Sequence, residues 1–487
     1  MNYGSIVQPS LFFFFFFETA SESHASTCVS PVLNSRACPK CPRGSFLRRR
    51  AKPSFSNGHG YSRRNKWPTE PVSNAAVEHS RILPAAFRAN FQSPCPFPGT
   101  HWRSTGSTRS FHSSPFTLSG RRITYRIAAS ASGKGQRFSP TKNVISFRPE
   151  KDAALGLQVG TTPFARRMSR FDSGEDAFFV SKVNGEPNTV AFGVADGVGG
   201  WSQSGVDPAD FSHALCSNMA QAALDWNTKV EKLSPRALMQ AGYERCLADQ
   251  SIFAGGSTAS IGIGHDDGRV ELANLGDSGS IFCRLAAIHQ YSISQTHAFN
   301  APYQLSLIPP LIRIQSSMFG GQIFEDFPCH ASVTNLKMQH GDVLILATDG
   351  VLDNLFNQDI LNIITDQMIT AGAWNVTSES GISVAADLDR FTHEGGLVQA
   401  PRVSTSANDS QSKQPISNPQ TRFLPLQDRL ALTVVRQAKV SSMDRHRDGP
   451  FAKEAQRYYP WDKWRGGKID DICAVVVVAV EEGRAES

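Results

Sequence analysis

Residues 189–201 read TVAFGVADGVGGW, an apolar run that ends in Asp196 and then continues into glycines at positions 197, 199 and 200. The apolar run predicts a β-strand, and the glycines predict a tight turn directly after it. A carboxylate at the end of a strand is ordinary turn chemistry. With almost no side chains beside it, however, this carboxylate also has room to hold a metal ion.

Other acidic residues occupy the same kind of position, at the end or the start of an expected strand. Two unit charges ~4 Å apart repel by roughly 4 kcal/mol at an effective dielectric of 20, so converging carboxylates must take up protons or bind cations. Ligand sets made of oxygen alone suit Mg²⁺ or Mn²⁺, and the carbonyl of Gly197 would add one more oxygen. The acidic residues in such positions are Glu175, Asp176, Asp277, Asp349, Asp470 and Asp471, with Asp353 one helical turn beyond Asp349.

Strand pairs joined by turns alternate with blocks of helix after residue 150, which predicts antiparallel sheets covered by helices rather than βαβ units. Residues 398–421 are rich in Ser, Asn, Gln and Pro, and are expected to form a disordered surface insertion in a domain that spans 150–483. Helices are expected at 207–226, 234–250 and 357–369. Strands are expected at 176–183, 189–195, 257–264, 269–275, 279–285, 342–348 and 472–480.

The first 130 residues have a different composition, with 17 Lys and Arg against 4 Glu and no Asp. They are expected to form a disordered mitochondrial targeting tail, and RSFHSS at 109–114 is similar to a mitochondrial processing site. A disordered linker and a plastid targeting segment are the alternatives, and the mitochondrial matrix is the expected location. LFFFFFF at 11–17 is far shorter than the ~20 residues of a membrane span, so no transmembrane segment is expected. The remaining chain has 32 Lys and Arg against 39 acidic residues, a charge that disfavours nucleic-acid binding. A monomer is expected.

Six of these segments resemble, in order, the motifs of the protein phosphatase 2C family of metal-dependent Ser/Thr phosphatases. The resemblance covers roughly residues 160–482. HAFNAPYQL at 297–305 and GPFAKEA at 449–455 are similar to the mitochondrial branch of that family. The six motifs are GEDAFFV (174–180), VADGVGGW (194–201), GGSTASIGI (255–263), NLGDSGS (274–280), LATDGVLDNL (346–355) and GGKIDDICAVVVV (466–478).

The resemblance implies an α+β fold, a four-layer αββα sandwich of two antiparallel sheets flanked by helices, with a two-metal centre of Mg²⁺ or Mn²⁺. It implies hydrolysis of phosphoserine and phosphothreonine in mitochondrial proteins by a hydroxide that bridges the metals. By this resemblance the catalytic residues are Asp196, Asp349 and Asp176, of which Asp176 orients metal-bound water. The implied ligands are Asp196 for both metals, Glu175 and the Gly197 carbonyl for the second, Asp349 and Asp470 for the first, and Asp277 and Asp353, with Asp349, for a third, weaker ion.

Three departures from the family pattern leave alternatives open. Val198 stands where much of the family has a His that can protonate the leaving group. Arg170 is one residue earlier than the usual phosphate-binding Arg, so it is either that phosphate ligand or a surface residue. Asp471 replaces a common Asn, so either Asp470 or Asp471 is the ligand, and the resemblance favours Asp470. The alternative function is therefore a weakly active or inactive scaffold that binds phosphoproteins.

Overall fold

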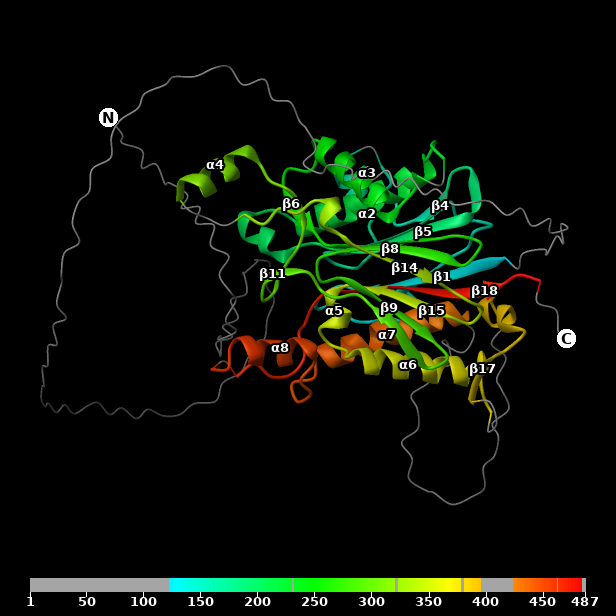
Figure 1. The fold of residues 1–487 in the computed structure, drawn as a ribbon. Coiled ribbons are helices and arrows are strands. Elements are labelled where there is room, and N and C mark those ends of the chain that lie inside the picture. Colours follow the sequence, from blue (N-terminus) through cyan, green and yellow to red (C-terminus); the bar gives the residue numbers. More distant parts are fainter. Residues whose placement is uncertain are drawn as a thin grey trace, which may run out of the picture. The chain divides into compact units, whose positions relative to one another are not determined.

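Two six-stranded antiparallel sheets lie face to face, and helices cover the outer face of each (Figure 1). The computed structural model describes residues 122–483, except 161, 230–231, 320–322, 378–380, 396–423 and 462. These described residues belong to one structural unit. The layers are helix, sheet, sheet and helix, which confirms the predicted α+β sandwich.

Each sheet combines strands from distant parts of the chain, and all strand pairs within the two sheets are antiparallel. The first sheet has the spatial order β10 (Ala287–Tyr291), β9 (Gly279–Arg284), β15 (Val343–Ala347), β18 (Ile472–Glu481), β1 (Ile123–Ser132) and β2 (Val144–Phe147). The second has the order β14 (Ser332–Lys337), β8 (Arg269–Leu275), β7 (Ala259–Gly264), β5 (Glu186–Asp196), β4 (Asp176–Val183) and β3 (Ala154–Leu155).

The long helices form the two outer layers. α2 (Pro208–Leu224) and α3 (Pro235–Ala248) pack on the second sheet, and α6 (Asn357–Thr370) and α7 (Leu426–Ser442) pack on the first. The shorter helices are α1 (Pro163–Met168), α4 (Pro310–Phe319), α5 (Asp349–Leu352), α8 (Pro450–Tyr458), η1 (Gly199–Ser204), η3 (Pro328–His330) and η4 (Leu388–Thr392). Short strand pairs are β6 (Gly255–Ser257) with β13 (Leu305–Leu307), β11 (Thr296–Ala298) with β12 (Ala301–Pro302), and β16 (Trp374–Thr377) with β17 (Gly381–Val384).

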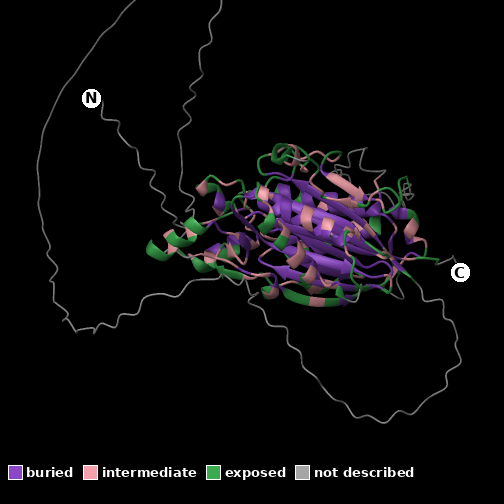
Figure 2. Cartoon of the chain, turned by 90° about the horizontal axis from the view of Figure 1, so that it is seen from above, coloured by how far each residue is buried: buried purple, intermediate pink, exposed green. Residues whose placement is uncertain are grey.

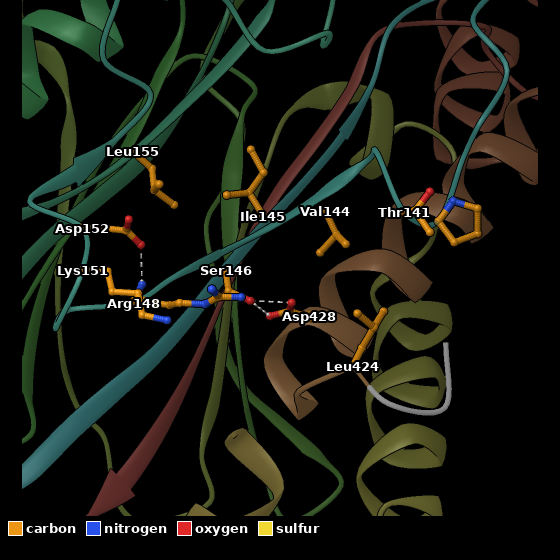
Figure 3. Close-up of a pocket in the computed structure, with 11 residues that line it drawn as sticks. Thr141, Val144, Ile145, Ser146, Arg148, Lys151, Asp152, Leu155, Leu424 and Asp428 are labelled. Carbon is orange, nitrogen blue, oxygen red and sulfur yellow. Dashed lines mark hydrogen bonds between the residues drawn. The ribbon is translucent and has the colours of Figure 1, made fainter. Parts of the chain in front are cut away.

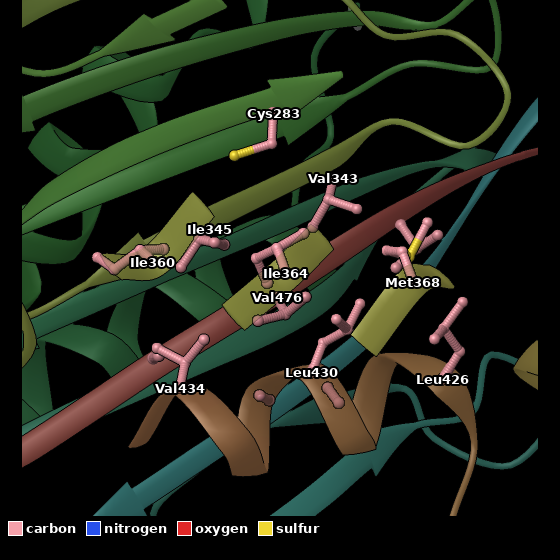
Figure 4. Packing of buried hydrophobic residues seen from close by; sticks show 14 of the residues in the cluster. Cys283, Val343, Ile345, Ile360, Ile364, Met368, Leu426, Leu430, Val434 and Val476 are labelled. Carbon is pink, nitrogen blue, oxygen red and sulfur yellow. The ribbon is translucent and has the colours of Figure 1, made fainter. Parts of the chain in front are cut away.

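Strand β18 shows how the apolar layers are built. Val476 and its even-numbered neighbours face α6 and α7, in a cluster that includes Leu430 of α7 and Ile345 of the neighbouring strand β15 (Figure 4). Val475 and Val477 point the other way, into the layer between the two sheets. Figure 2 shows this buried interior between exposed outer surfaces. Because both faces of β18 are buried, its sequence is apolar throughout instead of alternating.

The helices expected from residues 207 and 234 are present as α2 and α3, and a side chain caps the N-terminus of each. The Asp207 side chain accepts a hydrogen bond from Ala209 N at 3.1 Å, and Ser234 accepts one from Ala237 N at 3.2 Å. Each helix then begins with a proline, which lacks the N–H that would otherwise need a partner there. Among the described helices, none combines the length and the apolar composition that a bilayer span requires.

The predicted domain boundaries at 130 and 150 are wrong. Strand β1 pairs along its whole length with β18, from Ile123 opposite Glu481 to Ser132 opposite Ile472, and it also pairs with β2. Its sequence, ITYRIAASAS, contains small and polar residues that give a weak strand pattern, and its partner lies about 350 residues away. The rest of the predicted tail, residues 1–121, and the predicted insertion at 398–421 lie outside the described residues.

The position of β1 gives a stability prediction. Ile127 is fully buried between the sheets, so Ile127→Ala should lower the free energy of unfolding by roughly 2–5 kcal/mol. Val333→Ala, at a side chain 46% exposed on edge strand β14, should cost about 0.5 kcal/mol or less. Urea unfolding of both variants measures the difference, and equal costs would contradict a core position for β1.

Candidate metal centre

The strand-end carboxylates lie at one common end of the two sheets. In the second sheet Asp176 begins β4 directly opposite Asp196, which ends β5. In the first sheet Ala347 pairs with both Gly279 and Ala474. This register brings the segments that carry Asp277, Asp349 and Asp470 to the same sheet end.

Three of these carboxylates meet closely. Asp196, Asp277 and Asp349 each offer an oxygen, and these oxygens all lie within 4.8 Å of one another. Asp353 caps the C-terminus of the short helix α5, which Asp349 begins. The structure therefore brings together carboxylates from both sheets, as the sequence pattern predicts.

The glycines after Asp196 allow close packing against the Glu175 segment. A β-carbon at Gly197 would lie 2.8 Å from the Pro208 carbonyl oxygen and 3.0 Å from that of Glu175. A β-carbon at Gly199 would lie 3.2 Å from Glu175 Oε2. Gly199 thus leaves room for the Glu175 carboxylate, and Gly197 leaves room for the carbonyls of Pro208 and Glu175.

Asp471 accepts hydrogen bonds from the backbone of two segments beside the carboxylate cluster. Its Oδ2 accepts a hydrogen bond from Glu175 N at 2.8 Å, and its Oδ1 accepts one from Lys134 N. Gly174 has φ +72°, and a β-carbon there would collide with the Asp471 carboxylate. Asp471 therefore positions the loop of Glu175 through backbone bonds, whereas Asp470 lies 3.0 Å from the ammonium of Lys468.

Two buried carboxylate oxygens have no hydrogen-bond partner among the described residues: Asp176 Oδ1 and Asp277 Oδ1. The other oxygen of Asp176 accepts a hydrogen bond from Thr348 Oγ1 at 2.7 Å, and Cys473 N donates to that hydroxyl at 3.0 Å. Buried polar atoms are nearly always paired, so these two oxygens indicate a missing cation or water. Thr348, between Ala347 and Asp349 in a predicted motif, was not identified from the sequence as a functional residue.

Lys468 is a second residue that sequence reasoning missed. Its Nζ lies 2.6 Å from Asp349 Oδ2, 2.8 Å from Asp353 Oδ2 and 3.0 Å from Asp470 Oδ2. Although burial opposes its charge, the carboxylates of Asp349, Asp353 and Asp470 hold the pKa of Lys468 well above its ordinary value. The only sequence signal was its place in GGKIDD, two residues before Asp470.

Burial and mutual repulsion raise the pKa of most of the carboxyl groups. Burial, reinforced by Asp471 and Asp470, raises the pKa of Glu175 to about 7. Burial and then the charge of Asp349 raise the pKa of Asp196 and of Asp277. For Asp349 itself, burial acts in the same direction, but the nearby Lys468 outweighs it and lowers the pKa. The cluster thus needs positive charge to remain ionised.

These residues fit a centre for hard divalent cations. Carboxylates and one backbone carbonyl supply only oxygen, the ligand type that Mg²⁺ and Mn²⁺ take. The close approach of three carboxylates and the two unpaired oxygens are both relieved by bound cations. The backbone of Asp196 is also held in place, because its carbonyl oxygen accepts hydrogen bonds from Thr258 N and Ser257 Oγ.

The expected phosphate-binding role of Arg170 is not supported. Its guanidinium is paired with Asp210 and, at 3.4 Å, with Asp207, both at the start of α2. An arginine already neutralised in this way has little charge to offer a phosphate. Val198, for its part, packs against the small apolar cluster of Trp201, Ala254 and Ile308.

A cavity also lies elsewhere in the described part of the chain. It has a volume of about 470 Å³ and lies beside β2, β3 and the start of α7 (Figure 3). Ser146 donates a hydrogen bond to the buried carboxylate of Asp428 at its wall. None of the clustered carboxylates lines this cavity, so it is separate from the candidate metal centre.

Comparison with curated proteins gives phosphatase relatives, although no protein-family model matches the chain. The chain is 32% identical over 228 residues to protein phosphatase 2C homolog 7, mitochondrial, of Saccharomyces cerevisiae, covering 46% of this chain and 64% of that one. It is 30% identical over 322 residues to 5-azacytidine resistance protein azr1 of Schizosaccharomyces pombe, covering 64% and 86%. It is 36% identical over 263 residues to protein phosphatase PTC7 homolog fig of Drosophila simulans, covering 53% and 74%. The match thus spans less than two thirds of the Saccharomyces cerevisiae relative and more than two thirds of the other two.

Solved structures with a similar chain include the photosystem II phosphatase PBCP, at 23% identity and a TM-score of 0.42, covering 65% of this chain and 94% of that one. Another is the catalytic domain of the serine threonine protein phosphatase PstP in complex with two manganese ions, at 13% identity and a TM-score of 0.35. That match covers 74% of this chain and 100% of the other.

A buried histidine beside the Glu175 loop gives a pH prediction. His213 Nε2 lies 3.1 Å from the Gly174 carbonyl, and burial, followed by the charge of Arg170, lowers its pKa from 6.5 to about 4. Between pH 6.5 and about 4, His213 is therefore protonated in the unfolded chain but neutral in the folded chain. Relative to His213→Gln, the wild type should therefore lose about 3 kcal/mol of unfolding free energy as the pH falls through this window. Urea unfolding of both proteins across the window tests this, and parallel pH profiles would contradict it.

Proposed function

Because this chain belongs to the protein phosphatase 2C family, in the branch of the mitochondrial PTC7 homologues, we propose that it is a metal-dependent phosphatase of mitochondrial phosphoproteins. Its substrates would be phosphoserine and phosphothreonine side chains. The observation that carries the proposal is the meeting of Asp196, Asp277 and Asp349 within 4.8 Å at the shared end of the sheets.

The proposed metal ligands are those that the family resemblance implies, and Asp196 and Asp349 of this set lie in the close group of three carboxylates. Asp349 and Asp470 would hold the first ion, and Glu175 and the Gly197 carbonyl the second, with Asp196 between them. When bound, Mg²⁺ or Mn²⁺ activates water for attack on phosphorus and neutralises charge on the phosphoryl oxygens.

Asp176 is the proposed orienting acid. Thr348 fixes one of its oxygens, which leaves Oδ1 to accept a hydrogen bond from the attacking water and so orient it. Asp471 acts further out, because its two backbone hydrogen bonds fix the loop that carries Glu175. These contacts would set the geometry of the site before substrate arrives, the condition under which positioned groups contribute most to rate.

The alternative, a phosphoprotein-binding scaffold with weak or no turnover, rests on Val198. A valine packed against apolar side chains cannot protonate a leaving alkoxide, so the proton must come from another donor. Against this alternative, every carboxylate that the family resemblance requires is present, and the three at the core converge. Turnover measured with metal separates the two functions.

The metal assignment predicts which carboxylates are required for activity. The protein should hydrolyse a phosphoserine or phosphothreonine peptide with Mn²⁺ or Mg²⁺ and stop in chelator. Asp196→Asn and Asp349→Asn should each lower kcat/KM by more than the ~10- to 100-fold typical of a residue that only supports a metal ligand. Asp267→Asn is the matched control, because Asp267 is exposed and pairs with Lys337 on the far end of the sheet. A folded Asp196→Asn protein with full turnover would overturn the assignment.

The same assay distinguishes Asp470 from Asp471. Asp470→Asn removes a charged ligand of the first ion, so it should severely lower both the affinity for Mn²⁺ and the turnover. Asp471→Asn keeps an acceptor for only one of its two backbone N–H partners, so it should cost less, about tenfold, mainly through a looser Glu175 loop. The reverse order of the two effects would make Asp471 the ligand.

We also propose that the chain acts in the mitochondrial matrix, directed by residues 1–111. Their basic, acid-poor composition and the RSFHSS segment support this, and these residues lie outside the described part of the structure. Fused to a fluorescent reporter, residues 1–111 should carry it into mitochondria, and sequencing of the mature protein should find an N-terminus near Phe111–Ser113. A reporter that stays outside mitochondria would refute the targeting role.

A further inference from the structure

Lys468 places a positive charge inside the candidate metal centre. Its Nζ contacts Asp349, Asp353 and Asp470 at 2.6, 2.8 and 3.0 Å. Among the described residues, no other Lys, Arg or His forms an ion pair with the clustered carboxylates. We propose that the Lys468 ammonium is a built-in cation of this centre, which balances these carboxylates in the metal-free protein and competes with divalent ions for them.

The position of this lysine is fixed by its backbone. Asn354, fully buried, donates from Nδ2 to the Lys468 carbonyl at 2.8 Å and accepts from Lys468 N at 2.9 Å. The same Nδ2 also donates to the Gly350 carbonyl in α5 at 2.9 Å. Asn354 therefore ties the lysine to the helix that carries Asp349 and Asp353.

The side chain is enclosed as well. Only 14% of it is exposed, and its Nζ lies 4.9 Å from the centre of the Phe451 ring. The negative face of an aromatic ring attracts a cation, so Phe451 also stabilises the ammonium. The three carboxylates and the ring thus form a cation-binding site, and the ammonium of Lys468 occupies it.

Competition follows from the shared oxygens. The first proposed ion needs Asp349 and Asp470, and a third, weaker ion would need Asp349 and Asp353, so the ammonium contacts ligands of both. Like charges in so small a space repel, and a dication can reach these oxygens only as the ammonium withdraws. Lys468 should therefore lower the affinity for the first ion and keep the third position free of metal.

The inference rests on the metal centre of the proposed function, and metal binding tests it without any measurement of activity. Lys468→Met keeps an unbranched side chain and removes the charge. Equilibrium dialysis of the full chain against Mn²⁺ should show an affinity higher by about tenfold or more, because one nearby positive charge is gone, and one additional bound ion. In chelator, the same variant should melt several degrees below the wild type. Lys337→Met, which removes an exposed ammonium paired with Asp267, should change neither quantity.

The opposite signs of these two changes distinguish charge balance from packing. A lysine that only packed would give a Lys468→Met protein that is less stable and binds Mn²⁺ no better, and that result would overturn the proposal. The double variant Lys468→Met/Asp353→Asn removes one charge of each sign and should recover melting temperature in chelator, whereas failure to recover would also overturn it. If Mn²⁺ binds as expected but no phosphopeptide is hydrolysed, the proposed function fails while the role of Lys468 stands. If neither the wild type nor Lys468→Met binds Mn²⁺, both proposals fail.

Discussion

The repulsion between buried carboxylates is the constraint around which this structure is arranged. Two sheets that share no strands end at the same place, and each contributes acidic residues there. At an effective dielectric of 20, each pair ~4 Å apart costs roughly 4 kcal/mol if both groups are ionised, a large part of a domain's stability. The contacts nearby reduce this cost by one of two means: a hydrogen bond to an ionised oxygen, as from Thr348 to Asp176, or an ammonium, as from Lys468.

The sequence predicted the layers and most of the centre because both leave local signals. Alternating or continuous apolar runs mark strands, and an acidic residue at the end of such a run can be recognised without its partners. Strands β5 and β15, for example, each show an apolar run that ends in an acidic residue, although the two strands belong to different sheets. The same locality explains why the helices that begin at Pro208 and Pro235 were expected close to their observed positions.

What the sequence could not predict depends on contacts between distant residues. Strand β1 is recognisable only beside β18, whose sequence begins about 350 residues later, and α7 follows a long polar segment that hides its start. Lys468 looks like an ordinary loop lysine until the fold sets it beside Asp349 and Asp353. Arg170 shows the converse, since its position in the sequence suggested a phosphate ligand while its partners on α2 already neutralise it.

The surroundings of Lys468 link the charge of the centre to the segment between β11 and β12. Phe451, which lies under the ammonium, contacts Phe299 with ring centres 5.1 Å apart. Phe299 also contacts Tyr458, the last residue of α8, and Tyr459 directly after it, so one group of aromatic rings extends from this segment to the cation. Beside it, His297 is held between the rings of Tyr303 and Phe324 and hydrogen-bonded to Asp326 at 2.8 Å. A movement of Phe299 would therefore change the packing of Phe451 and the surroundings of the ammonium. The charge of the centre and the position of this segment are thus not independent, because the same aromatic rings contact both.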